Sequence, residues 1–513
     1  MDGVSRLLQK ENGLMKKKDL KELFTKSDWN DQTIIEADNV VSKIAKDYLG
    51  LDIYPNQFEI TSSEQMLDAY SLIGLPLSYN HWKFGKDFVV NTNNYKRGRM
   101  GLAYELVINS NPCISYNMED NTTCLMVLVL AHAAYGHNHF FKNNYLFKQW
   151  TQADSIIDYM LFAKNFIAKC EEKYGYEEVE MVLDACHALM NYGVDKYKKP
   201  SKLSPEEEQK RLKKKIEDDR VLLDDIWRTL PKEEEKRKRK ERYPAQPEEN
   251  ILYFIEKNSP KLKGWQREIV RIVRKVSQYF YPQGQTKVIN EGCATFCHYE
   301  IVNKMFEEGY LDDGFMLEFM HHHSNVVFQP GFDSKFYSGL NPYTLGFNIF
   351  SDLKRMSLDP TPEDLHWFPD IAGKGNWAEN FRWIVENFKD ETFVLQYLSP
   401  KVMRDMRLFE ISDESDSNFY KISSIHNEKG YKKVRQSLSE FYNRSRYVPD
   451  IQVYNVDVYG NRSLTLEYTP LDGRELDSNE VDKVLPHVKY LWGFPVKVVQ
   501  RGLEKLTVIS SLE

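Results

Sequence analysis

A histidine-rich segment that directly follows a continuous apolar run is the feature that most constrains this chain. Residues 125–130 are all apolar, and His132, His137 and His139 follow within nine residues. An uninterrupted apolar run is typical of a buried element, and here we expect a core helix. The imidazoles then lie at the edge of the protein interior, where polar side chains need partners.

A second segment, far along the chain, supplies a carboxylate and another imidazole. In residues 290–298, NEGCATFCH, Glu291 and His298 are seven residues apart. Seven residues are two helical turns, so both side chains can face the same point. Imidazoles and carboxylates that converge from two helices are the usual ligands of a divalent metal. We therefore expect a metal site with hydrolytic chemistry.

The spacing of the first two histidines sets a condition on the helix that carries them. Five residues separate His132 from His137, which is about 140° around a regular α-helix, so they would not share a face. They converge if the helix ends or bulges at Gly136, and π-bulges favour functional sites. His139 is better phased if the helix runs straight. The alternative is a helix end whose histidines cap carbonyls or face solvent.

The order of these elements resembles that of the gluzincin metallopeptidases. A candidate strand at residues 105–109 precedes the histidine helix, and an Asn-Glu-Gly helix comes much later. The resemblance implies that His132, His137 and Glu291 hold zinc, with water in the fourth position. The chain departs from the His-Glu-x-x-His pattern, because an alanine follows His132 and the spacing is one residue longer. The general base must come from elsewhere, and Glu105 and Glu119 are the candidates.

Two acid-x-x-His pairs suggest a different chemistry. The pairs Asp184/His187 and Glu318/His321 each place two ligands on one helix face, as in helical bundles that hold two iron or manganese ions. Glu291 and Glu105 could supplement them. The alternative is that Asp184 only orients His187, and that the histidines at 321–323 form a polar helix end. His81 lies among aromatic residues on an expected strand. It either lines a pocket or is a core histidine whose hydrogen bonds are made within the protein.

Composition limits the class of protein. A length of 513 residues indicates two or three domains, and a net charge of −7 argues against a nucleic-acid partner. No apolar run approaches the roughly 20 residues of a membrane span, and the first twenty residues are charged throughout. We expect a cytoplasmic protein. The six cysteines form no Cys-x-x-Cys pair, which favours reduced, buried thiols.

The expected fold is mainly α, and α+β overall: a helical, zincin-like core with a small β element, followed by a C-terminal α+β module. Strands are expected at residues 79–90 and 100–117, and a hairpin that turns at Gly460 in the last hundred residues. The segment between the two halves of the core is densely charged, which indicates a solvated insertion. The expected divisions are a helical N-terminal segment (1–75), the first half of the core with the strands and the histidine helix (76–196), the charged linker (197–248), the second half of the core (249–410) and the C-terminal module (411–513).

Long strings of this sequence resemble the SpoVR family, also called stage V sporulation protein R. They include YNHWKFGKDF, AHAAYGHNHFFKNNYLF, VINEGCATFCHY, DDGFMLEFMHHHSNVVFQP and GLNPYTLGFNIFSDLKR. The resemblance runs from about residue 79 to the C-terminus. It implies a cytoplasmic bacterial protein tied to the spore cortex, a peptidoglycan layer, or to stress physiology. It also implies an AAA-type serine protein kinase and a von Willebrand factor A-like protein as partners.

The resemblance also implies a set of site residues, since seven side chains fall at family-motif positions. His139 and His322 fall at variable positions. We expect a divalent metal, zinc in the first place, with iron or manganese as alternatives. The function hypotheses are a metal-dependent hydrolase, a non-enzymatic regulator in a kinase complex, and a dimetal carboxylate oxidoreductase. The seven implied residues are His132, His137, His187, Glu291, His298, His321 and His323.

Overall fold

The structure is a computed structural model of the chain, and it describes most but not all of the residues. Between the main ranges it also describes a few single residues, at 78–89 and 206–214. Most of the charged linker and much of the region around residue 90 therefore lie outside the described residues. The main described ranges are 17–71, 105–198, 243–331, 334–412, 421–424, 426–444, 447–470, 473–502 and 506–512.

The chain divides into two compact units, each built from two separate stretches of sequence. Unit 1 consists of residues 1–184 and 275–448, and unit 2 consists of residues 185–274 and 449–513. The divisions fall inside α9 (Tyr176–Ala188) and α12 (Gly264–Gln285). Each unit is described by itself below.

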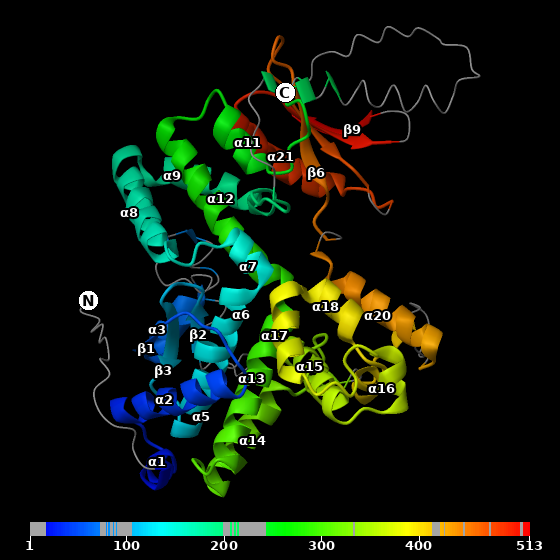
Figure 1. Ribbon diagram of the computed structural model, residues 1–513. Coiled ribbons are helices and arrows are strands. Elements are labelled where there is room, and N and C mark those ends of the chain that lie inside the picture. Colours follow the sequence, from blue (N-terminus) through cyan, green and yellow to red (C-terminus); the bar gives the residue numbers. More distant parts are fainter. Residues whose placement is uncertain are drawn as a thin grey trace. The chain divides into compact units, whose positions relative to one another are not determined.

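Unit 1 is mainly helical, and α13 (Lys287–Glu307) lies at its centre (Figure 1). This helix packs against α15 (Pro342–Leu358), α2 (Asp31–Asp47) and a π-helix (Leu130–His137). The other helices of the unit are α1 (Lys17–Phe24), α3 (Ser63–Ser71), α5 (Thr123–Val129), α6 (Asn138–Asn143), α7 (Tyr145–Trp150), α8 (Ile156–Tyr174), α14 (Asp313–Val326), α16 (Pro362–Trp367), α17 (Trp377–Asn387), α18 (Asp390–Tyr397), α19 (Pro400–Asp405) and α20 (Glu428–Tyr442).

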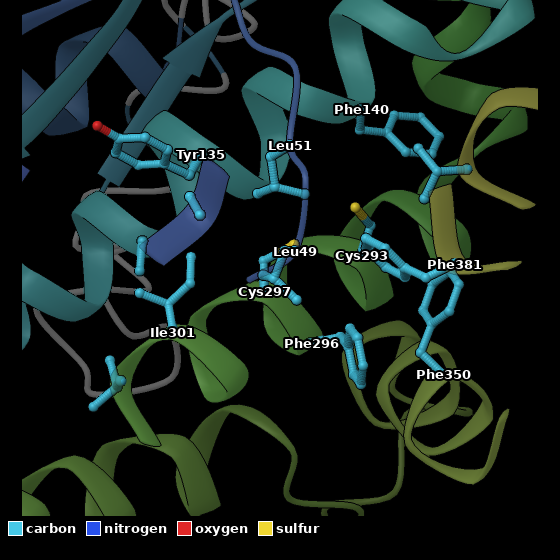
Figure 2. Close-up of a cluster of buried hydrophobic side chains, with 14 of the residues drawn as sticks. Leu49, Leu51, Tyr135, Phe140, Cys293, Phe296, Cys297, Ile301, Phe350 and Phe381 are labelled. Atoms are coloured by element: carbon cyan, nitrogen blue, oxygen red, sulfur yellow. The ribbon is translucent and has the colours of Figure 1, made fainter. Parts of the chain in front are cut away.

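One face of α13 supplies the apolar centre of unit 1 (Figure 2). Cys293, Phe296 and Cys297 recur at steps of three and four residues, so they share a helix face, and all are buried. The ring of Phe296 lies 5.1 Å from that of Phe381 in α17. All six cysteines of the chain are buried, as expected, and none is paired in a disulfide.

A small mixed sheet in unit 1 stands next to the π-helix. Its strand order is β1 (Asn56–Thr61), β3 (Cys113–Met118) and β2 (Glu105–Ile108), so β2 is an edge strand. Strand β1 runs parallel to β3, and β2 runs antiparallel to it. The prediction of a purely helical N-terminal segment was wrong at β1. The short run NQFEIT has little periodicity, and its long-range pairing with β3 decides its conformation.

The expected strand at residues 79–90 is also corrected where the structure describes it. Trp82, Lys86 and Val89 are helical. Their spacing of four and three residues is that of one helix face, which the aromatic composition of the segment had obscured. A two-stranded sheet of β4 (Glu410–Ser412) and β5 (Lys421–Ser424) completes the strands of unit 1.

Unit 2 contains the C-terminal α+β element that the sequence predicts. Its four-stranded sheet has the order β6-β7-β8-β9, and the antiparallel β6/β7 pair is the expected hairpin. The backbone N–H of Gly460 donates to Asp457 Oδ1 within the turn. No described helix is long and apolar enough to cross a membrane. The elements of unit 2 are α11 (Ile251–Asn258), the 3-10 helix Met190–Tyr192, β6 (Ile451–Val456), β7 (Leu464–Tyr468), α21 (Ser478–Trp492), β8 (Val496–Arg501) and β9 (Leu506–Leu512).

Candidate metal site

The histidine helix is a π-helix, as the five-residue spacing required. Residues Leu130–His137 form this helix directly after α5, and every one of them is buried. In a π-helix the hydrogen bonds run from residue i to residue i+5, so side chains five apart lie one turn above another. The rings of His132 and His137 accordingly have centroids 4.7 Å apart. The predicted bulge near Gly136 is thus present and brings the two imidazoles together.

Helix α13 places a carboxylate against both imidazoles. Glu291 Oε2 lies 3.4 Å from His137 Nε2 and 3.9 Å from His132 Nε2. On the other side of the His137 ring, Nδ1 lies 2.9 Å from Asn290 Oδ1. An amide oxygen only accepts, so His137 Nδ1 carries a hydrogen, and Nε2 is the nitrogen that faces Glu291.

The first residue of β2 brings a second carboxylate. Glu105 Oε1 lies 3.3 Å from His132 Nε2, and Glu105, His132 and His137 form a group whose ligand atoms lie within 4.8 Å of one another. The side chains of Glu105 and Glu291 remain 19% and 16% exposed, whereas the two histidines are almost fully buried. The carboxylates therefore form the side of the group that faces solvent.

The donor atoms fit a divalent cation in both spacing and charge. In a tetrahedral site with bonds of about 2.0–2.1 Å, neighbouring ligand atoms are about 3.3 Å apart. The distances from Glu105 Oε1 to His132 Nε2 and from Glu291 Oε2 to His137 Nε2 are 3.3 and 3.4 Å. Glu105 Oε2 and Glu291 Oε2 are buried and have no hydrogen-bond partner. Two carboxylates with unmet bonding capacity match the charge of one divalent ion.

The electrostatics of the metal-free group show the same demand for positive charge. Burial opposes a charge on His137, but the carboxylate of Glu291 outweighs it and raises the pKa of His137 to about 9. Burial would raise the pKa of Glu291, yet His137 and His132 hold it well below its usual range. Burial raises the pKa of Glu105. A proton on His137 thus supplies the positive charge that a bound cation would supply in its place.

Behind His132 a chain of buried imidazoles leads away from the carboxylates. His132 Nδ1 lies 2.9 Å from His298 Nδ1, and His298 Nε2 lies 2.9 Å from His323 Nδ1. Each contact needs one donor and one acceptor. With His132 Nε2 turned to a cation, His132 Nδ1–H donates to His298, and His298 Nε2–H donates to His323. Burial and the neighbouring imidazoles lower the pKa of His298 well below its usual range, and burial lowers the pKa of His323 to about 4, so these two imidazoles are neutral.

Two further features hold α13 and the π-helix in place. The carboxylate of Asp390 accepts hydrogen bonds from the backbone N–H groups of Val288 and Ile289, in the first turn of α13. A Cβ on Gly136 would come within 2.6 Å of Ala294 Cα, so the π-helix and α13 meet at a glycine. Sequence reasoning did not identify Asn290 or Asp390. Asn290 stands next to Glu291 and could have been found, whereas Asp390 has no local signal.

The structure does not bring the other predicted residues to this group. Glu119 is exposed in the turn after β3. His187 lies half-buried on α9, and His321 is exposed and accepts from Asn325. The acid of each acid-x-x-His pair has other partners: Asp184 contacts His81, and Glu318 accepts from Thr122. Within the described residues of the chain, neither three-residue group of potential ligands contains His187 or His321.

His139, the alternative to His137, is buried elsewhere. Its Nδ1 lies 3.0 Å from the carbonyl oxygen and 3.1 Å from the backbone nitrogen of Asp52, so it contacts the segment after α2. Burial lowers its pKa to about 4. His322 forms an ion pair with Glu318 at 3.6 Å. The π-helix thus selects His137 as the partner of His132, and His139 ties the fold together.

Comparison with known proteins agrees with the resemblance of the sequence strings. The family model described as SpoVR like protein matches residues 28–447, and that of the SpoVR-like C-terminal domain matches residues 449–501. The chain therefore belongs to the SpoVR-like protein family. The Uncharacterized protein YcgB of Escherichia coli (strain K12) is 56% identical over 464 residues, which cover 90% of each chain. No solved structure matches the chain.

Proposed function

We propose that this protein is a metal-dependent hydrolase whose divalent cation, zinc in the first place, is held by His132, His137 and Glu291. The observation that carries the proposal is the convergence of these donor atoms from the π-helix and α13, with Glu291 Oε2 3.4 Å from His137 Nε2 and 3.9 Å from His132 Nε2, beside Glu105 of β2. The order of edge strand, histidine helix and glutamate helix supports a zincin-like arrangement. His137 and Glu291 lie far apart in the sequence, so it is the fold that brings their side chains together.

Glu105 takes the role of general base in this proposal. A bound zinc ion would supply Lewis acidity and lower the pKa of a water molecule. Glu105 begins the edge strand and has one buried oxygen without a hydrogen-bond partner, so it can accept a proton. Burial raises its pKa above the usual range, the direction that favours a general base. It stands in for the glutamate that follows the first histidine in gluzincins, where this chain has Ala133.

The test separates metal binding from turnover. Glu105→Gln keeps the size of the side chain but cannot accept a proton, so the variant should retain its zinc and lose hydrolysis of peptide or peptidoglycan fragments. Glu119→Gln, which changes an exposed acid in the turn after β3, is the matched control and should keep both. Undiminished turnover in Glu105→Gln would refute the base assignment.

A second candidate is a non-enzymatic protein in which the cation is structural. The contact that favours it is the same Glu105 Oε1 to His132 Nε2 distance, because a fourth protein ligand would close the site. In that case Glu105→Gln loses zinc together with stability, and wild-type protein hydrolyses nothing. Such a protein would act as a regulator with the AAA-type serine kinase and the von Willebrand factor A-like protein. We propose a role in cortex or stress physiology for either form.

A further inference from the structure

A second group of potential ligands lies in unit 1, apart from the residues described above. His81 Nε2 lies 3.1 Å from Asp184 Oδ1 and 3.7 Å from Glu180 Oε1. The ligand atoms of all three residues lie within 4.8 Å of one another. Glu180 and Asp184 are four residues apart on α9, which places them on one helix face. The two distances bracket the spacing of about 3.3 Å expected between ligands of one tetrahedral ion.

The imidazole of this group is buried, and the two carboxylate side chains are increasingly exposed to solvent. The exposed fraction of the side chain is 1% for His81, 13% for Glu180 and 37% for Asp184. Glu180 Oε2 is buried without a hydrogen-bond partner. Trp82 contacts one oxygen of each carboxylate: its backbone N–H donates to Glu180 Oε1, and its indole N–H donates to Asp184 Oδ1. Packing and hydrogen bonds thus hold the group in place and leave Glu180 Oε2 buried without a partner.

Negative charge in this group is not matched by basic side chains. Like charges four residues apart on one helix face repel each other. No lysine or arginine in the described ranges forms an ion pair with Glu180 or Asp184. A third acid, Glu171, lies near: burial and then the charge of Glu180 raise its pKa, and its Oε1 is buried without a partner. A protonated His81 could offset only one of these charges.

We propose that His81, Glu180 and Asp184 bind a second divalent cation, with Asp184 at the solvent side. One imidazole and two carboxylates form an oxygen-rich donor set, which suits manganese better than the histidine-rich site does. This inference does not depend on the proposed hydrolase, because it concerns different residues.

The experiment is a titration of metal-free, full-length protein with Mn²⁺, in which free Mn²⁺ is followed by electron paramagnetic resonance. It is performed in the His132→Ala background, which removes a ligand of the first site, and the Glu180→Gln comparison assigns the binding to the second site. One equivalent should bind, and adding Glu180→Gln should abolish that binding. Glu178→Gln, which changes an exposed acid on the same helix, is the matched control and should leave it unchanged.

Two results would overturn the inference. The first is absence of Mn²⁺ binding in folded His132→Ala protein, which would make the group a plain ion-pair cluster. The second is equal binding in the Glu180→Gln and Glu178→Gln variants. Circular dichroism and thermal unfolding verify that each variant is folded. The proposed hydrolase is tested separately. It is contradicted if the zinc content stays unchanged when His132 or Glu291 is replaced.

Discussion

At the residue scale, the exchange of a proton for a cation at His137 determines how the candidate site responds to pH. Glu291 holds this imidazole in its charged form, because a buried carboxylate needs a positive partner. Only the neutral imidazole binds a metal. The cation and the proton therefore compete for the same nitrogen, His137 Nε2.

We predict that the apparent zinc affinity rises with pH up to about 9. Below that pH the metal-free protein keeps the proton on His137, since its pKa is raised to about 9. Displacement of one proton makes the affinity increase about tenfold per pH unit. Competition with a chelator of known pH dependence at pH 6, 7 and 8 measures the slope. An affinity that does not change over this range would contradict the assignment of His137 as a ligand.

Sequence reasoning identified most of the residues that meet in this group. His132, His137 and Glu291 stood out because histidines and an acid in buried helical segments need partners. Glu105, one of the two base candidates, lies beside His132. Glu119, the other candidate, is exposed. A local pattern does not reveal which of two nearby acids faces inward, because the strand register decides it.

At the scale of the element, the π-helix is what turns a five-residue spacing into a shared face. A regular α-helix would point His132 and His137 in different directions. The close approach to α13 at Gly136 holds this helix against the glutamate. The sequence indicated the bulge through the spacing itself. The hydrogen bonds from Val288 and Ile289 to Asp390 were not foreseen, because the partner is about a hundred residues away.

We expect Gly136→Ala to weaken both the fold and the site. Its Cβ would meet the backbone of Ala294 at 2.6 Å, so α13 must move. Overpacking of this kind destabilises by about 1–3 kcal/mol. Urea unfolding, with and without zinc, measures the loss. Gly314→Ala, in the first turn of α14 where the new Cβ has ordinary contacts, is the control. Equal free energies of unfolding for the two variants would show that the close approach is unimportant.

At the scale of the whole molecule, the predominantly helical fold and the C-terminal α+β element followed from hydrophobic periodicity and turn residues. Strand β1 and the helical conformation at Trp82, Lys86 and Val89 did not. Short segments take their conformation from distant partners, and β1 owes its pairing to β3. Division into two units of interleaved sequence is likewise a property of long-range contacts, which local patterns do not encode.

The most direct test of the central claim is the zinc content of purified protein, measured by elemental analysis. His132→Ala and Glu291→Gln should each contain one equivalent less than wild type, because each removes a ligand atom from the group around the π-helix. His321→Ala, which changes an exposed histidine, should keep the wild-type content. Equal zinc content in wild type and all three folded variants would contradict the account.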